Sequence, residues 1–136
     1  MSSPAIHHSP PVTILVVDNL PVNLDLARSI LEPFGYRVIT AGGMNEGLAI
    51  ARQQHCDLIL SDVCMPEGTG YDFIQAVRAD PRLRDIPFVF ITSTLVDEKD
   101  RARGLALGAD RFLFRPIEPE AFLTQIRKCL REKQRN

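Results

Sequence analysis

Short apolar runs alternate five times with segments in which apolar residues recur every three or four positions. The runs predict strands, and the spaced segments predict amphipathic helices with one buried face. Two runs, Leu58-Ile59-Leu60 and Phe88-Val89-Phe90-Ile91, are apolar without interruption, which is typical of central strands that helices cover on both sides. Strands that alternate with helices form a parallel sheet with right-handed crossovers, so the sequence predicts an α/β fold.

Turn residues mark the ends of several predicted elements. Gly35 suits the turn after the first helix and Gly108 suits a cap after the fourth. Asp80-Pro81 closes the third helix, because the residue before a proline is disfavoured in helical geometry. The expected strands are residues 12–17, 36–40, 57–61, 87–91 and 111–114. The expected helices are residues 21–34, 44–54, 70–79, 98–107 and 118–131.

The composition indicates one small domain. A chain of 136 residues buries about two-thirds of the surface that its unfolded form exposes. Its 16 basic and 17 acidic residues are balanced, so no overall field attracts nucleic acid or an anionic membrane. No apolar stretch approaches the roughly 20 residues of a membrane span. We expect a domain at 12–131, a disordered tail at 1–11 that lacks the pattern of a signal peptide, and a tail or linker at 132–136.

The 3 cysteines are an odd number and form no C-x-x-C pair. They therefore support neither a disulfide framework nor a zinc site. Reduced thiols in a cytoplasmic protein are the simpler interpretation.

Polar residues stand where four of the predicted strands end. Asp18 and Asn19 close the first apolar run, Asp62 closes the third, Thr92 follows the fourth, and Arg115 follows the fifth. The carboxyl ends of parallel strands meet at one edge of the sheet, where ligands bind in open α/β folds. The sequence therefore predicts that these side chains form one site.

Phosphoryl chemistry on Asp62 accounts for this set of residue types. A carboxylate that accepts a phosphoryl group needs a divalent cation, and Mg²⁺ takes hard oxygen ligands. The hydroxyl of Thr92 and the guanidinium of Arg115 are suited to hold the phosphoryl oxygens. The candidate metal ligands are the side chains of Asp18, Asn19 and Asp62 and the main-chain oxygen of Cys64.

Each of these residues also has an ordinary structural explanation. Asp62 suits a turn or a cap, and Asp18 suits the N-cap of the first helix. Thr92 suits a strand position facing a helix, and Arg115 suits a solvated surface. Their joint occurrence at the ends of successive strands favours the functional interpretation.

The chain resembles the receiver domain of two-component response regulators over roughly residues 12–131. The resemblance implies a flavodoxin-like (βα)5 three-layer sandwich with strand order 2-1-3-4-5. It rests on Ile14-Leu15-Val16-Val17-Asp18, Asp62-x-x-x-Pro66-x-x-x-Gly70, Ile86-Pro87 leading to Ile91-Thr92, Leu107-Gly108-Ala109-Asp110 and Arg115-Pro116.

The resemblance implies a phosphorelay function with Mg²⁺ as cofactor. A phosphohistidine on a histidine kinase or phosphotransfer protein would phosphorylate Asp62. Thr92 would then move toward the phosphoryl group and Phe112 would turn inward, changing the surface of the fourth helix, fifth strand and fifth helix. A cis Arg115-Pro116 peptide would turn the arginine toward Asp62. Such a domain is a signalling module rather than an enzyme, and it makes no direct contact with nucleic acid or membrane. The resemblance leaves open whether an output domain follows the C-terminus and whether the chain forms a homodimer.

Three residues depart from the receiver pattern. Asn19 stands where the family usually has a second acid, so we expect weaker Mg²⁺ binding. Arg115 stands where the family has a lysine. The planar guanidinium of arginine does not make the same contact as the compact ammonium group of a lysine. Phe112 has no hydroxyl, so a switch there works by packing. These departures keep open a degenerate receiver that binds a partner without being phosphorylated.

Two other classes fit less well. A small α/β phosphatase or hydrolase would want an acid two residues after Asp62, where this chain has Cys64. A flavodoxin-type cofactor binder would want a Ser/Thr/Gly-rich loop after the first strand, which is absent.

Overall fold

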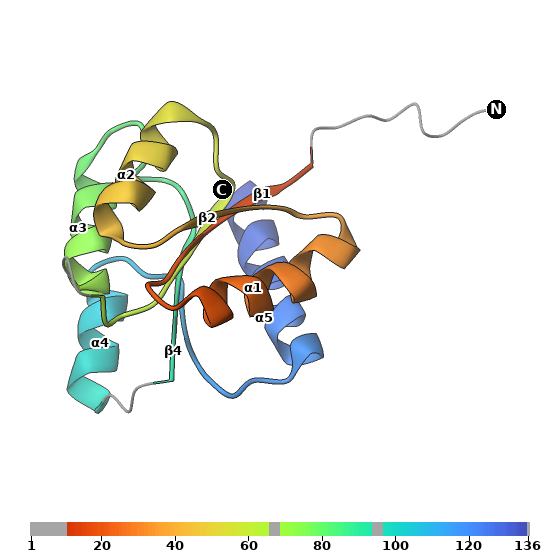
Figure 1. Ribbon diagram of the computed structural model, residues 1–136. Coiled ribbons are helices and arrows are strands. Elements are labelled where there is room, and N and C mark those ends of the chain that lie inside the picture. The colour runs from red at the N-terminus through yellow and green to blue at the C-terminus, as the bar shows by residue number, and fades with distance from the viewer. Residues whose placement is uncertain (1–10, 66–68, 94–96, 136) are drawn as a thin grey trace.

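The computed structural model describes residues 11–65, 69–93 and 97–135, and Figure 1 shows their course. The five predicted strands form, each within one residue of its expected bounds. Apart from Pro11, the expected N-terminal tail lies outside the described residues, as does Pro66 of the receiver motif. The strands are β1 (Thr13–Val17), β2 (Arg37–Ala41), β3 (Leu58–Ser61), β4 (Phe88–Thr92) and β5 (Arg111–Phe114). The helices are α1 (Pro21–Leu31), the short 3-10 helix η2 (Glu32–Phe34), α2 (Met44–Gln53), α3 (Gly70–Ala79), α4 (Glu98–Ala106) and α5 (Pro119–Arg135).

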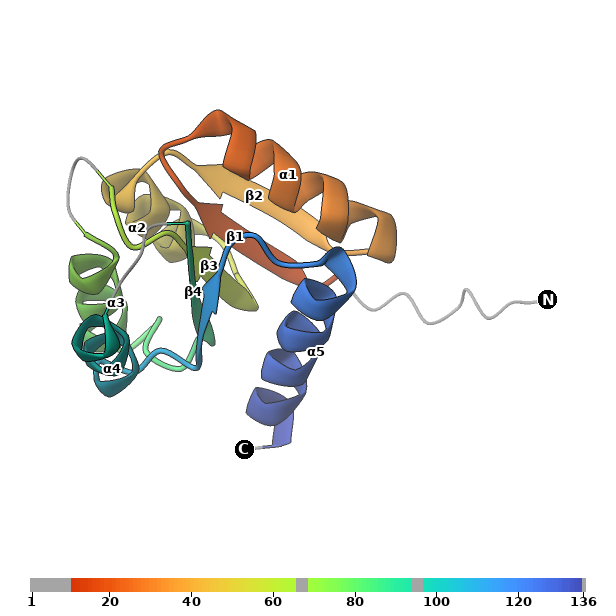
Figure 2. The same ribbon diagram turned by 90° about the horizontal axis from the view of Figure 1, so that it is seen from below.

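The strands form one parallel sheet in the order β2-β1-β3-β4-β5, as the resemblance predicted. Figure 2 shows α1 and α5 on one face of this sheet and α2, α3 and α4 on the other. The chain is therefore a three-layer α/β sandwich of the flavodoxin-like type. In the described part of the chain, no helix has both the length and the apolar character that crossing a lipid bilayer requires.

Each face of the sheet has its own hydrophobic core, because successive strand side chains point to opposite faces. Leu15, Ile59 and Phe88 belong to the cluster under α2, α3 and α4. Ile14 and Leu58 belong to the cluster under α1 and α5. Both faces are covered, which explains why the central strands β3 and β4 are apolar up to their last residues, Ser61 and Thr92.

The first and last helices end at different residues from those expected. Pro33 has no N–H to continue α1, so the helix ends at Leu31 and the chain tightens into η2 before Gly35, whose φ is 91°. Helix α5 continues to Arg135, past the expected end at residue 131. Its last turns are attached to β5, because Arg111 Nη2 lies 2.6 Å from Oε2 of Glu132.

Arg78 joins two loops at the edge of the sheet where the strands begin. Its Nη1 donates to the carbonyl oxygens of Arg84 (2.9 Å) and Ile86 (2.6 Å), just before β4. Its Nη2 donates to the carbonyl oxygen of Gly108 at 2.7 Å, just before β5. One guanidinium on α3 therefore fixes the entries to two neighbouring strands.

Candidate functional site

The parallel sheet brings the predicted site residues to one edge. Asp18 follows β1, Asp62 follows β3, Thr92 ends β4 and Arg115 follows β5. Backbone hydrogen bonds hold these ends in register: Asp62 N donates to Val17 O at 3.0 Å, and Arg115 N donates to Thr92 O at 2.8 Å. Four side chains that are far apart in the sequence thus lie beside one another.

Asp18 is almost fully buried, with an exposed fraction of 1%. Its Oδ1 accepts from the backbone N–H of Leu20 at 2.9 Å, at the start of α1. Its Oδ2 accepts from Nδ2 of Asn23 at 3.0 Å and lies 3.5 Å from Nη2 of Arg115. The N-cap of α1 is Leu20, and no side chain caps this helix, so Asp18 does not have the N-cap role that its position suggested. Its carboxylate instead belongs to the site.

Asp62 is also buried, with an exposed fraction of 8%, and its Oδ1 accepts from the Val63 N–H at 2.7 Å. Burial, and secondly the neighbouring Asp18 carboxylate, raise the pKa of Asp62 above its usual range. Hydrogen bonds from the Val63 N–H, the Thr92 side chain and the Cys64 N–H oppose this shift. Two buried carboxylates side by side, with the pKa of one raised, fit a site that a cation would complete.

Arg115 turns back over the edge of the sheet. The Arg115-Pro116 peptide is cis, as the resemblance implied, and the side chain is 13% exposed. Its ion pair is with Asp18 rather than with Asp62, which we expected it to face. The second guanidinium nitrogen, Nη1, is buried without a hydrogen-bond partner in the part of the chain that the structure describes.

The other two candidate metal ligands are at the rim. Asn19 and Cys64, whose main-chain oxygen is the candidate ligand, are exposed residues, whereas Asp18 and Asp62 are buried. Within residues 11–65, 69–93 and 97–135, no group of three His, Cys, Asp or Glu side chains is placed to hold a metal. The described site therefore offers two carboxylates, and further oxygen ligands would come from Asn19, the backbone or water.

Phe112 is packed inward, with an exposed fraction of 8%. Its ring centroid lies 5.3 Å from that of Phe90 and 5.2 Å from that of Phe114. Gly104 of α4 makes room for the ring, since a Cβ there would lie 3.1 Å from Phe112. The exposed position that we expected before phosphorylation is thus not the one observed. A glycine in the middle of a polar helix was the sequence signal for this packing.

Asn23 is a site residue that the sequence analysis missed. It lies in the first turn of α1, and its amide donates to Oδ2 of Asp18. A first turn that contains an asparagine but no acid, directly after a strand-end aspartate, was the available signal. Oδ2 of Asp18 therefore accepts from two donors, the amide of Asn23 and the guanidinium of Arg115.

The site residues lie within a stretch that matches a known family. A family model described as the response regulator receiver domain matches residues 14–127. The chain is 36% identical over 122 residues to the DNA-binding dual master transcriptional regulator RpaA of Synechocystis, which covers 90% of this chain and 50% of that protein. It is 31% identical over 125 residues to response regulator Rre1 of the same organism, covering 91% of this chain and 54% of the relative. This chain therefore spans about half the length of the curated relatives it matches.

Solved structures give the same result. The chemotaxis response regulator CheY4 of Vibrio cholerae superposes with a TM-score of 0.81 at 31% identity, over 88% of this chain and 98% of that one. A CheY-like receiver domain protein from Methanospirillum hungatei superposes with a TM-score of 0.85 at 26% identity, over 92% of this chain and 98% of that one. With the strand order, these matches show that the chain belongs to the receiver domain family of two-component response regulators.

Proposed function

We infer that this domain accepts a phosphoryl group on Asp62 from a phosphorylated histidine of a partner kinase or phosphotransfer protein. The observation that carries the proposal is the position of Asp62: it is the buried carboxylate that has Asp18, Thr92 and backbone donors around it. The family supports the wider statement that the chain is a signalling module of two-component systems.

In the transfer step, an oxygen of Asp62 attacks phosphorus, the new O–P bond forms, and the P–N bond to histidine breaks with its electron pair left on nitrogen. The raised pKa of Asp62 reflects a carboxylate that is poorly solvated and hence a stronger nucleophile. The Thr92 hydroxyl, which now bonds to Asp62, would donate to the incoming phosphoryl oxygens. Arg115 would contribute positive charge at the same edge.

Mg²⁺ is the proposed cofactor, held by Asp18 and Asp62 with Asn19 and the Cys64 main-chain oxygen. Bound there, it would neutralise charge on the phosphoryl oxygens. This chain supplies one carboxylate fewer than a typical receiver, and Arg115 already contacts one of the two it has. We therefore expect phosphorylation to be slower than in a typical receiver.

The test is intact-mass measurement after incubation with acetyl phosphate and excess Mg²⁺. We expect a phosphoryl adduct in the parent protein and none in Asp62→Asn. Asp57→Asn is the matched control, because Asp57 lies at the opposite end of β3, where its carboxylate accepts from Thr13 N at 2.7 Å. An adduct that persists in Asp62→Asn, or an absence of adduct with every phosphodonor, would refute the proposal.

A second candidate function is phosphorylation-independent binding of a partner protein. Phe112 already has the inward position that phosphorylation would otherwise promote, which favours this alternative. If the parent takes no phosphoryl group and Asp62→Asn binds its partner as tightly as the parent, the alternative replaces the first proposal.

A further inference from the structure

Helix α4 is held against the sheet by few buried side chains. Within the described residues 97–135, Gly104 is the only buried residue of this helix. It packs on two rings of the core, since a Cβ there would lie 3.1 Å from Phe112 and 3.2 Å from Phe90. Segments with few buried apolar contacts open and move at a low cost in free energy. The contacts that α4 makes at its surface therefore decide how firmly it is held.

Tyr71, in the first turn of α3, makes two contacts with α4 and is 6% exposed. Its hydroxyl donates to the carbonyl oxygen of Asp100 at 2.9 Å. The guanidinium carbon of Arg103 lies 4.5 Å from the centroid of the Tyr71 ring, within the range of a cation–π contact. Asp100 and Arg103 are one turn apart and lie on one face of the helix. One side chain therefore holds the N-terminal turns of α4 against α3.

Tyr71 is also attached closely to the backbone of Asp62. It follows Gly70, whose N–H donates to Val63 O at 2.7 Å. The contact is tight, because a Cβ on Gly70 would lie 2.5 Å from the carbonyl oxygen of Asp62. Interiors packed this closely transmit a displacement to their neighbours. A shift of the backbone at Asp62 therefore moves the start of α3, and Tyr71 with it.

Inward rotation of Phe112 is not available as a response to phosphorylation. Its ring is already packed inward, 5.3 Å from that of Phe90 between centroids. The Tyr71 ring contacts the same phenylalanine, with 5.7 Å between the centroids. Tyr71 therefore touches the core beside Phe112 and also the helix that Phe112 supports, and it is joined to Asp62 through Gly70.

We propose that Tyr71 is a latch for α4: it holds the N-terminal turns of the helix against α3 in the resting domain, and phosphorylation of Asp62 releases them. On release, the Tyr71 hydroxyl leaves the carbonyl oxygen of Asp100, and water solvates both groups. The trigger rests on the proposed function, whereas the hold of Tyr71 on α4 does not. Coupling between two sites is reciprocal, so removing the latch must favour the phosphorylated state by the factor by which phosphorylation weakens the latch.

The first test is amide hydrogen exchange of the ¹⁵N-labelled full chain, without Mg²⁺ or phosphodonor. Tyr71→Phe removes the hydroxyl and keeps the ring. We expect the amides of Arg101 and Gly104 to exchange about 3- to 10-fold faster than in the parent, because one hydrogen bond to α4 is lost. The amide of Leu107, which donates to Arg103 O at 3.0 Å near the end of the helix, should change little.

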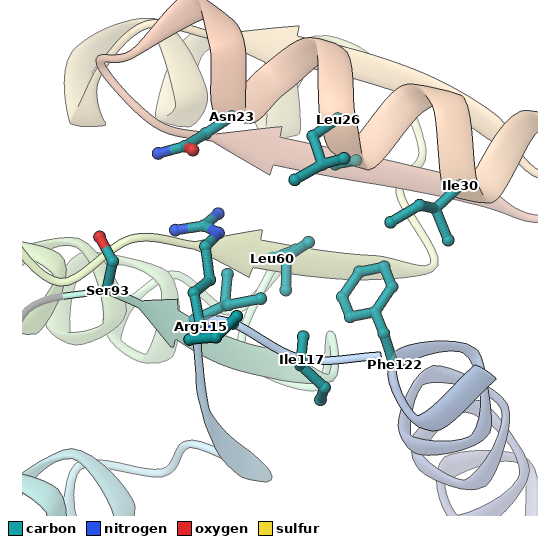
Figure 3. Close-up of a pocket in the computed structure, with 11 residues that line it drawn as sticks. Asn23, Leu26, Ile30, Leu60, Ser93, Arg115, Ile117 and Phe122 are labelled. Atoms are coloured by element: carbon teal, nitrogen blue, oxygen red, sulfur yellow. The ribbon is translucent and has the colours of Figure 1, made fainter. Parts of the chain in front are cut away.

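The control is Tyr36→Phe, which removes the hydroxyl of the other tyrosine. Tyr36 packs on the core under α1 and α5, to which Ile30 and Phe122 in Figure 3 also belong. This core lies on the face of the sheet opposite α4 (Figure 2), so exchange in α4 should stay at the parental rate. If Tyr71→Phe exchanges in α4 as slowly as Tyr36→Phe, Tyr71 does not hold the helix and the proposal is wrong.

The second test measures the coupling with beryllofluoride and Mg²⁺, a mimic of the phosphoryl group on Asp62. In the parent, saturating beryllofluoride should raise exchange at Arg101 and Gly104 to the rate seen in free Tyr71→Phe. Tyr71→Phe should bind beryllofluoride about 3- to 10-fold more tightly than the parent or Tyr36→Phe. Equal affinities, or unchanged exchange in the loaded parent, would overturn the coupling. A parent that binds no beryllofluoride would overturn the proposed function and with it the trigger, while the exchange comparison would still decide whether Tyr71 holds α4.

Discussion

Gly70 is the first residue of α3 and packs directly against the backbone of the proposed phosphoacceptor. A Cβ at this position would lie 2.5 Å from the carbonyl oxygen of Asp62 and 3.0 Å from Cα of Val63. It would also lie 2.7 Å from a ring carbon of Phe90, which is fully buried. The Gly70 N–H donates to Val63 O at 2.7 Å, which holds the helix start in place.

We expect Gly70→Ala to lower the free energy of unfolding by about 2 kcal/mol. Overpacking costs about 1–3 kcal/mol, and two of the three close atoms are backbone that cannot change rotamer. The helix propensity of alanine returns at most about 1 kcal/mol. Relief of the clash requires α3 or the Asp62 backbone to move, so phosphorylation by acetyl phosphate should slow as well.

Urea unfolding followed by circular dichroism measures the stability change. Gly42→Ala is the matched control, because a Cβ there would meet only Oε1 of Glu46, at 3.7 Å. The free energy of unfolding of this control should stay within about 0.5 kcal/mol of that of the parent. If Gly70→Ala proves as stable as Gly42→Ala and is phosphorylated at the parental rate, the close approach is not a constraint and our reasoning is wrong.

Three further perturbations test other features. Asn19→Asp adds a carboxylate at the rim of the site and should tighten Mg²⁺ binding about tenfold in a calorimetric titration; unchanged affinity would remove this position from the ligand set. Hydrogen bonds from Arg82 lower the pKa of Asp80 from 3.8 to about 2, so Asp80 stabilises the fold above pH ~4 and loses that effect as the pH falls through the folded value. Asp80→Asn should therefore melt earlier than the parent at pH 7, and the two melting curves should converge toward pH ~2. Gly104→Ala should displace the Phe112 ring from Phe90, seen as lost nuclear Overhauser contacts between the rings, while helix propensity keeps stability within about 1 kcal/mol of the parent.

The fold was predictable because each strand and helix has its own local sequence pattern. The strands were located by uninterrupted apolar runs, and their parallel pairing followed from the intervening helices. The end of α5 was not predictable in this way. Residues after Arg131 are polar, so the sequence predicts a tail there. The helix continues because Glu132 pairs with Arg111, which is 21 residues away in the sequence. Long-range ion pairs of this kind leave no local pattern.

That the candidate site residues lie together was predictable, whereas the hydrogen bonds and ion pairs among them were not. Register alone brings Asp18, Asp62, Thr92 and Arg115 to one edge. Arg115 pairs with Asp18 rather than with Asp62. This choice depends on side-chain rotamers and burial, which the sequence pattern does not determine. The inward position of Phe112 likewise depends on the space left by Gly104, on a helix that is distant in the sequence from Asp62.

The Arg78 linkage has a mechanical consequence for signalling. It anchors the chain at Gly108, immediately after α4, while the other end of that helix begins near the edge that carries Asp62. A helix held at one end responds to a push as a lever does, with the smallest displacement at the fulcrum and the largest at the opposite end. That end of α4 is in contact with α3, because the Tyr71 hydroxyl donates to the Asp100 carbonyl oxygen at 2.9 Å, and a swing of the helix would change this contact. We therefore expect any movement of α4 to be an angular swing about Gly108, greatest near Asp97. Spin labels placed along the helix would record a graded change in distance rather than a uniform one.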